Sequence, residues 1–330
     1  MMLRRREALR LAALGGTAGL LGPWSNPAAA QGSFPDRPIR LLVPNAAGGV
    51  ADLTARAVGQ GLSERLKQPV VVENRPGAGG IVAGQALTSS APDGYTLMVA
   101  TNANAISKSL FRSLPFDPIK DFVPVGLMGT FSIALLVSPK SPIRTVQDLV
   151  KKLKSDPART NIGTISVGST QNLAAELFKT SAGIEAVTVP FNGTPALLTA
   201  LLRDDVTVAF EIVAPLMGQI RDGSLRAIAV TSAARAANLP EVPTLREAGL
   251  ADFEVTSWNA LVAPAKTPAP VIARLNTELN AVLADAAIRK QLLEAGVEAQ
   301  GGTAEALGQR MSSEAEKWAG VIEKAGIEKQ

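Results

Sequence analysis

The sequence contains neither cysteine nor histidine. Without cysteine the chain can form no disulfide and has no thiol nucleophile. Without histidine it lacks the usual base of serine and cysteine hydrolases and the side chain that most often holds zinc. An enzyme made from this chain would have to use carboxylates, lysine, serine or the single tyrosine, Tyr95. These absences weigh against an enzyme and exclude a zinc site made of histidine and cysteine; we expect neither a metal nor a cofactor.

The first thirty residues have the pattern of an export signal. Basic residues come first, the apolar stretch from Leu11 to Leu21 is too short to span a membrane, and small residues end at Ala30. We expect cleavage after Ala30 and residence in the periplasm. The run from Arg5 to Arg10 resembles a twin-arginine signal, and an ordinary secretory signal with a basic start fits equally well.

The basic character of the chain comes mostly from this signal. The full sequence has a net charge of +4 and a pI of about 9.4. Removing the first thirty residues takes away four arginines and one glutamate and leaves a charge of about +1. Later segments have no dense basic run and no apolar stretch of membrane length. We therefore expect the mature chain to bind neither nucleic acid nor a membrane.

Short apolar runs alternate with segments of helical period along the mature chain, which is long enough for two domains. This alternation is typical of βαβ units and predicts an α/β fold with mostly parallel, doubly wound sheets. The expected strands are 38–44, 69–75, 95–101, 160–166, 186–191, 206–211 and 225–231. Two longer apolar segments, 122–139 and 253–264, should cross between two α/β halves and leave a cleft for a ligand.

Two glycine turns stand between a strand and a helix, one in each half. The first, PNAAGGVAD (44–52), matches neither the dinucleotide-binding nor the P-loop pattern. Its Gly48 and Gly49 let backbone N–H groups approach a ligand at a helix start, where an anion is favoured. The second turn, SVGSTQNL (166–173), repeats the arrangement. We predict that the two turns face each other and hold a carboxylate, although each could be a plain connection with Ser169 only a helix cap.

Further polar residues follow other strands. Asn102 and Asn104 lie beyond the third strand, and Asn192 precedes a helix that we expect Thr194 to cap. Glu211 ends another strand. In a cleft lined with donors this carboxylate could select ligands that carry a hydroxyl, amide or amine; otherwise it is a solvated surface group.

Several strings of residues occur in an order that is specific to one family. From about Phe34 to the C-terminus the chain contains PNAAGGVAD, VVVENRPGAGGIVAG, DGYTLMVAT, VPFNGTPALLTALL, RAIAVTSAARAANLPEVPTLREAGL and FEVTSWNALVAPAKTP. It thus resembles the Bug family, the TctC-type periplasmic solute-binding receptors of tripartite tricarboxylate transporters. The resemblance implies a type II periplasmic-binding-protein fold, with two α/β lobes joined by two crossing strands around a ligand cleft. It also implies a non-enzymatic receptor that delivers a small carboxylated solute to a membrane permease.

The resemblance also assigns roles to particular segments. In the family, backbone groups of two opposing loops grip the ligand carboxylate, and these loops correspond to Asn45–Asp52 and Ser166–Gln171. The acidic strand-end residue of the family, usually aspartate, corresponds to Glu211. The chain departs from the family at Asn45, where an aromatic residue is common, and at Asn172, where histidine is usual; TNANAIS also lacks a common histidine. We expect the grip to persist in altered side-chain surroundings, so no particular ligand is named.

The expected organisation has four parts. They are a signal peptide (1–30), a first lobe (34–131 with 257–300), a second lobe (132–256) and a C-terminal helix that packs on the lobes (301–330). We expect the protein to be a monomer.

The predicted site carries little positive charge. Its ligand-binding residues are Asn45, Ala47, Gly48, Gly49, Asp52, Asn102, Asn104, Ser166, Gly168, Ser169, Thr170, Gln171, Phe191, Asn192 and Glu211. Only Arg75 is basic among the loops at 44–52, 74–80, 100–105, 166–173 and 190–195. This favours a mono- or dicarboxylate over a tricarboxylate.

Two other functions remain as alternatives. An exported enzyme would need paired carboxylates in the cleft, for which Asp52 and Glu211 are the candidates; Asp52 is better placed to support its own loop. A receptor that signals to a membrane sensor kinase could have an identical binding site, so the sequence does not separate sensing from transport.

Overall fold

The computed structural model describes residues 34–330. The predicted signal peptide, its cleavage after Ala30 and the twin-arginine pattern lie outside the described residues. From Pro35 to Gln330 the chain folds as one unit. No helix in this part of the chain is both long and apolar enough to cross a membrane.

Lobe 1 is the part built on a sheet with the strand order β2–β1–β3–β9–β4. Its strands are β1 (Ile39–Val43), β2 (Val70–Asn74), β3 (Thr96–Thr101), β9 (Thr256–Pro264) and the first part of β4 (Phe122–Val137), with the short β10 (Glu298–Ala299) paired to β4. β1 runs parallel to β2 and β3, whereas β9 is antiparallel to both of its neighbours. The apolar side chains of β1 are buried, as expected for a parallel strand between layers of helices.

Lobe 2 is the part built on the continuation of this sheet, in the order β4–β7–β5–β6, with β8 also paired to β4. Its own strands are β5 (Asn161–Ile165), β6 (Val187–Phe191), β7 (Val208–Ile212) and β8 (Arg226–Val230). β5 runs parallel to β6 and β7, and β4 is antiparallel to β7 and β8. The alternation of strands and helices predicted from the sequence is therefore confirmed in both lobes.

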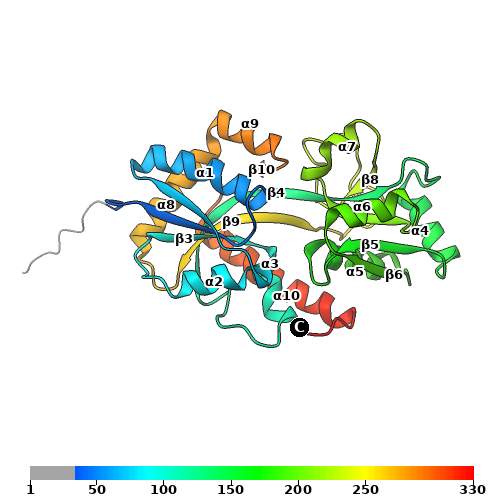
Figure 1. Ribbon diagram of the computed structural model, residues 1–330, viewed down its shortest axis with the longest axis horizontal. Helices are drawn as coiled ribbons and strands as arrows, with labels where there is room; N and C mark the ends of the chain where they lie inside the picture. Colours follow the sequence, from blue (N-terminus) through cyan, green and yellow to red (C-terminus); the bar gives the residue numbers. More distant parts are fainter. Residues whose placement is uncertain (1–33) are drawn as a thin grey trace, which may run out of the picture. The chain divides into compact units, whose positions relative to one another are not determined.

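Helices cover the faces of both sheets (Figure 1). Those that follow lobe 1 strands are α1 (Val50–Leu66), η1 (Ala78–Gly80), α2 (Ile81–Thr88), α3 (Asn102–Leu110), α8 (Ala269–Ala284), α9 (Ala286–Glu294) and α10 (Ala304–Lys324). Those of lobe 2 are α4 (Val146–Ser155), α5 (Thr170–Ala182), α6 (Thr194–Leu202), η2 (Ala214–Leu216) and α7 (Met217–Arg221). The cap predicted at Ser169 is confirmed, because its hydroxyl accepts the Asn172 N–H at the start of α5.

β4 and β9 connect the two lobes. The 16-residue β4 pairs with β9 from Phe122 to Ser132, and then with β7 and β8 from Ile133 onward. The chain leaves lobe 2 after residue 250 and returns to lobe 1 as β9 (Figure 1). The predicted fold, two α/β lobes joined by two crossing strands, is confirmed; we use "crossing strands" for β4 and β9 below.

The hydrophobic core of lobe 2 extends into helices that follow lobe 1 strands. Leu173 and Phe178 of α5 belong to the same buried cluster as Leu110 of α3 and Trp318 of α10. Trp258 of β9 lies in a separate cluster with α2 and α3 and is fully buried. α3 and α10 therefore contribute a second, apolar contact between the lobes besides the crossing strands.

The close packing of β4 on β10 makes Gly129 sensitive to substitution. A Cβ at Gly129 would lie 2.5 Å from Val297 Cγ1 and 2.8 Å from the Glu298 carbonyl oxygen. We expect Gly129→Ala to lower the free energy of unfolding by about 1–3 kcal/mol, because the rigid backbone of β10 must move. Thermal or urea unfolding of the purified protein measures this loss.

Gly320 in α10 is the matched control. A Cβ at Gly320 would meet nothing within 4 Å. Gly320→Ala should raise the free energy of unfolding by about 0.5–1 kcal/mol, because alanine favours the helix. Equal destabilisation by both substitutions would contradict the packing argument.

Candidate functional site

The first loop, residues 44–49, is held by the side chain of Asp52. Gly48, at a φ of 83°, donates its N–H to Asp52 Oδ2 at 2.9 Å. Asn74 at the end of β2 donates to Asp52 Oδ1 at 2.9 Å and to the Asn45 carbonyl at 3.1 Å. Asp52 is 2% exposed, whereas Asn45 to Gly49 are exposed. The buried carboxylate therefore fixes a loop whose outer surface is open to solvent.

Asp52 is an anion at neutral pH. It also accepts a hydrogen bond from Arg56 Nε at 3.0 Å, one helical turn away. Burial by itself would raise its pKa, but the hydrogen bonds from Arg56, the Gly48 N–H and Asn74 together hold the pKa of this carboxyl below its ordinary value. Its charge also lies in the first turn of α1, where the helix dipole favours an anion.

The second loop, residues 166–169, uses the same device with a neutral side chain. Gly168, at a φ of 78°, donates its N–H to Asn172 Oδ1 at 3.1 Å, and Asn172 Nδ2 donates to Thr164 Oγ1 at 3.2 Å. Ser166 donates its N–H to the Phe191 carbonyl at 3.2 Å, which ties this loop to β6. In each loop, a glycine in the left-handed region is bound by an Asp or Asn side chain four residues later.

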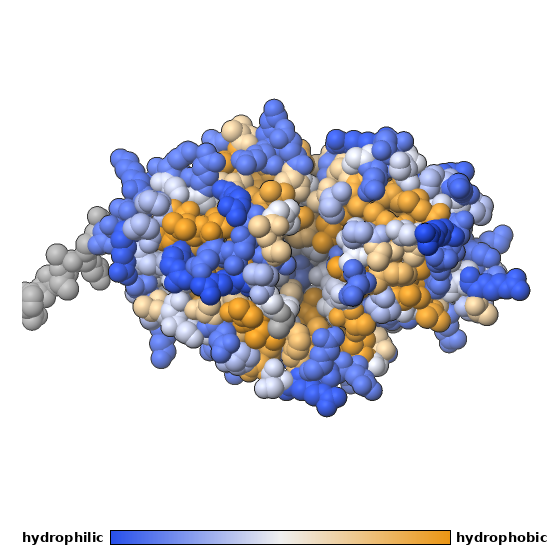
Figure 2. Space-filling view, in the orientation of Figure 1, coloured by the Kyte–Doolittle hydropathy of each residue, from blue (hydrophilic) through white to orange (hydrophobic). Residues whose placement is uncertain are grey.

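Both loops lie at the carboxyl ends of strands and open into helices. In Figure 1 the ends of β1 and β5 point toward the space between the lobes, and the surface in Figure 2 is hollowed there. α1 begins after Gly49, which has no side chain, so no N-cap side chain occupies its first N–H groups. At α5 the Ser169 hydroxyl occupies the Asn172 N–H. The arrangement offers backbone donors from two helix N-termini, a donor set suited to an anion.

Glu211 lies at the end of β7 and is 1% exposed. Its Oε1 accepts from Gln171 Nε2 at 2.7 Å and from the Ile212 N–H at 2.8 Å, and its Oε2 accepts from Thr194 Oγ1 at 2.9 Å. It is therefore not a solvated surface carboxylate. The cap predicted at Thr194 is wrong: α6 begins at Thr194 after Gly193, because the Thr194 hydroxyl is directed to Glu211.

The two asparagines after β3 make bonds within the protein. Asn102 Nδ2 donates to the Thr256 carbonyl at 3.1 Å and to Glu314 Oε2 at 2.9 Å, and its Oδ1 accepts the Trp258 N–H at 2.9 Å. Asn104 Oδ1 accepts the Thr101 N–H at 2.9 Å at the start of α3. Both side chains are buried. Asn102 thus joins β9 to α10, and a direct role in ligand binding stays a prediction for both residues.

The remaining predicted residues lie on or beside the two loops. Ala47 and Asn192 are exposed, Phe191 is half-buried, and Thr170 and Gln171 are buried in the first turn of α5. The structure brings the Ser166–Gln171 segment together with Phe191, Asn192 and Glu211 within lobe 2. Asn45 to Asp52 form a separate group in lobe 1. Ligand contact by any of these residues stays a prediction.

Three residues that shape the site were absent from the predicted set: Asn74, Asn172 and Thr194. A glycine followed four residues later by Asp or Asn occurs in both GGVAD and GSTQN, and this repeat could have identified Asn172. Asn74 and Thr194 act across 22 and 17 residues, and no local pattern indicates such contacts.

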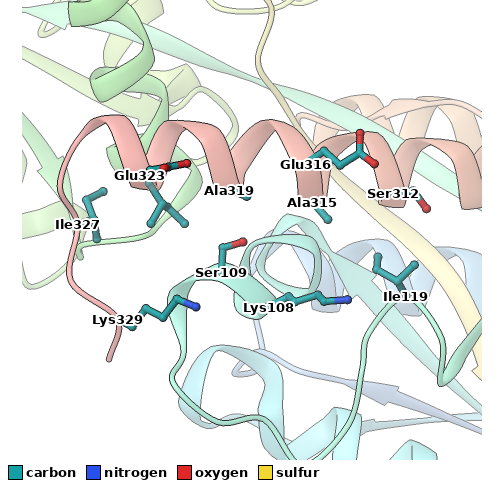
Figure 3. Close-up of a pocket in the computed structure, with 11 residues that line it drawn as sticks. Lys108, Ser109, Ile119, Ser312, Ala315, Glu316, Ala319, Glu323, Ile327 and Lys329 are labelled. Carbon is teal, nitrogen blue, oxygen red and sulfur yellow. The ribbon is translucent and has the colours of Figure 1, made fainter.

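A cavity of about 740 Å³ lies elsewhere, between α3 and α10. Figure 3 shows Lys108 and Ser109 on its α3 side and Ala315 and Ala319 on its α10 side. None of the predicted ligand-binding residues lines it. Within residues 34–330 no three side chains of the metal-binding types gather closely enough to hold a metal ion.

Comparison with known proteins identifies the family. The model of the family described as "Tripartite tricarboxylate transporter family receptor", TctC, matches residues 54–327. The chain belongs to the TctC family. Protein BugT from Bordetella pertussis is 32% identical over 312 residues, which are 94% of this chain and 94% of BugT.

Two solved structures show the same two-lobed fold. Rpa4515 of Rhodopseudomonas palustris, solved with adipate, has a TM-score of 0.78 and 32% identity, over 90% of this chain and all of that one. MatC from the same organism, solved with bound malate, has a TM-score of 0.73 and 30% identity, over 88% of this chain and all of MatC. The predicted periplasmic-binding-protein fold and solute-binding function are thus confirmed for this TctC protein. Neither the dyad enzyme nor the sensor is favoured by these relatives.

The ionised Asp52 makes loop stability depend on pH. Because its pKa is lowered in the folded state, Asp52 stabilises the fold above its ordinary pKa, and this contribution is lost as the pH falls through the folded value. We expect Asp52→Asn to cost about 1–2 kcal/mol of unfolding free energy near pH 7. The difference from the natural protein should shrink toward pH 3, as measured by urea unfolding at several pH values.

Asp156→Asn serves as the control for this experiment. Asp156 pairs with Lys152 at 3.2 Å, also four residues apart, with both side chains partly exposed. Such pairs contribute at most about 1 kcal/mol, so its substitution should change stability less at every pH. A loss for Asp52→Asn that does not vary with pH would show that its charge is not responsible.

Proposed function

We propose that this protein captures a small mono- or dicarboxylate in the periplasm and delivers it to the membrane permease of a tripartite tricarboxylate transporter. One observation carries the proposal. Each lobe presents a glycine loop at a helix N-terminus, and each loop is fixed by a side chain four residues further along. The adipate and malate in the two relatives solved with ligands are dicarboxylates, which supports this ligand class.

The charges around the loops favour a ligand with few negative groups. Residues 44–49 and 166–169 contain no lysine or arginine. The nearest cations in sequence on the two sides of the first loop are already paired, Arg40 with Glu73 and Arg56 with Asp52. Binding therefore relies on backbone N–H groups and helix dipoles, which suit one or two carboxylates better than three.

The same contacts argue against catalysis by a carboxylate pair. Asp52 and Glu211 belong to different lobes, and each accepts three hydrogen bonds from donors of its own lobe. The lowered pKa of Asp52 also makes it a poor general acid at neutral pH. We infer that the bound acid is released unchanged.

The proposed cycle uses the two crossing strands as a hinge. Ligand bound at one loop would draw the opposite lobe toward it and bury the carboxylate. We further propose that the exported chain is cleaved after Ala30 and works as a monomer, with a permease that recognises its loaded form.

A thermal-shift panel with the mature protein, residues 31–330, tests the proposal. The panel contains acetate, succinate, malate, adipate, citrate, benzoate and amino acids. A ligand that binds only the folded protein adds about 2.7 kcal/mol at one hundred times its dissociation constant. We expect the largest shifts from mono- or dicarboxylates and confirm them by calorimetry, with the acid recovered unchanged. No shift from any carboxylate, in protein shown to be ligand-free by native mass spectrometry, would contradict the proposal.

Gly48→Ala tests the first loop. At a φ of 83° an alanine is strained, although nothing lies within 4 Å of its Cβ, so the loop should shift while the fold remains. We expect at least a tenfold weaker carboxylate affinity. Gly223→Ala is the control, because Gly223 also has a positive φ of 79° and open space, in a turn after α7. Equal affinity losses in both variants would place the effect outside the loop.

Glu211→Gln tests ligand selection. Glutamine has the same shape but replaces one acceptor oxygen with a donor, which is mismatched to either Thr194 or Gln171. We expect the ratio of affinities for malate and succinate to change several-fold, while carboxylate binding itself persists. Uniform weakening for every acid in the panel would show that Glu211 has no part in selection.

A further inference from the structure

We propose that Thr54 and Asn259 are positioning residues, which fix the first turn of α1 against the crossing strand β9 and so aim its N–H groups at the ligand. The inference rests on the proposed function. Neither residue belongs to the two loops, and both are fully buried. Asn259 lies 205 residues from Thr54 in sequence, yet its Nδ2 donates to Thr54 Oγ1 at 3.0 Å.

The hydroxyl of Thr54 donates one hydrogen bond and accepts another. It donates its single proton to the Val50 carbonyl at 2.7 Å, so toward Asn259 it can only accept. The Asn259 amide must therefore turn its Nδ2 toward Thr54. Val50 is the first residue of α1, directly after the first loop. The chain of bonds thus runs from β9 to the carbonyl of the first residue of α1.

The arrangement leaves Asn259 only partly satisfied. Its Oδ1 is buried and has no hydrogen-bond partner among the described residues. A buried amide with an unpaired acceptor is less favourable than an apolar side chain of similar size. An asparagine at position 259 is explained if the hydrogen bond from its Nδ2 positions the first turn of α1 for ligand binding, in addition to stabilising the fold.

The backbone of β9 makes the anchor rigid. Asn259 is paired with Thr101 of β3 on one side and Gly129 of β4 on the other. Nearby, Asn102 holds the Thr256 carbonyl and the Trp258 N–H. The first turn of α1 is therefore tied to the part of β9 that begins the crossing between lobes, and not only to its own loop.

Thr54→Val is the informative substitution, because it keeps the shape of the side chain and removes the hydroxyl. In Thr54→Val we expect the dissociation constant for the best carboxylate of the panel to rise at least tenfold. Thr54→Ser keeps the hydroxyl, so its dissociation constant should stay within a few-fold of that of the natural protein. In the ligand-free protein, hydrogen exchange of the amides of residues 54–58 should become at least tenfold faster in Thr54→Val. The double variant Thr54→Val/Asn259→Leu should bind the carboxylate no more weakly than the single variant with the lower affinity. The reason is that each of the two substitutions removes the same hydrogen bond.

Ser63→Ala provides a matched control on the same helix. Ser63 Oγ donates to the Gly59 carbonyl at 2.8 Å and accepts the Val70 N–H at 2.8 Å, far from the ligand loops. This substitution should lower thermal stability and leave carboxylate affinity unchanged, whereas equal affinity losses would overturn the positioning role. Unchanged affinity in Thr54→Val would also overturn it. If the natural protein binds no carboxylate, the proposed function fails. In that case, unchanged hydrogen exchange of residues 54–58 in Thr54→Val would separately refute the role of the bonds from Asn259 through Thr54 to Val50.

Discussion

The hydrogen bond from a glycine N–H to a side chain four residues later is the constraint on which the candidate site depends. Gly48 and Gly168 both adopt positive φ values, which turn the chain sharply at the end of a strand. Without a partner, such a loop would sample many conformations at the surface. Asp52 and Asn172 each occupy one N–H of the turn that leads into the following helix. The backbone of both loops is therefore held in place by buried side chains.

The two lobes use this device with different charges. Four residues after the glycine, lobe 1 has the carboxylate of Asp52, which also accepts hydrogen bonds from Arg56 and Asn74. At the same position lobe 2 has the neutral amide of Asn172. The second buried carboxylate of the site, Glu211, joins α5 to α6 through Gln171 and Thr194. Both acidic groups thus have structural partners, which agrees with a protein of the TctC family that binds a solute.

The crossing strands and the α3–α10 pair connect the lobes in different ways. β4 and β9 are paired by an antiparallel ladder of backbone hydrogen bonds, in which the register shifts between Pro124 and Gly126 and again between Leu127 and Gly129. The contact of α3 and α10 with the lobe 2 core is made of apolar side chains such as Leu110 and Trp318. Non-directional apolar contacts can slide more readily than a ladder can shear. This difference fits the proposal that the crossing strands act as the hinge, with the helix pair adjusting as the lobes close.

Short-range patterns in the sequence determined the strand–helix alternation, both glycine loops and the cap at Ser169. Each of these depends on residues within one turn or one strand, whose spacing can be read directly. Local spacing misplaced the start of α6, since the Thr194 hydroxyl serves Glu211 from another strand. Only the tertiary structure decided how Asn74 holds the first loop, why Asn102 faces β9 and α10, and that Asn259 reaches Thr54. These contacts join residues far apart in the chain, and their geometry exists only after the sheets have assembled.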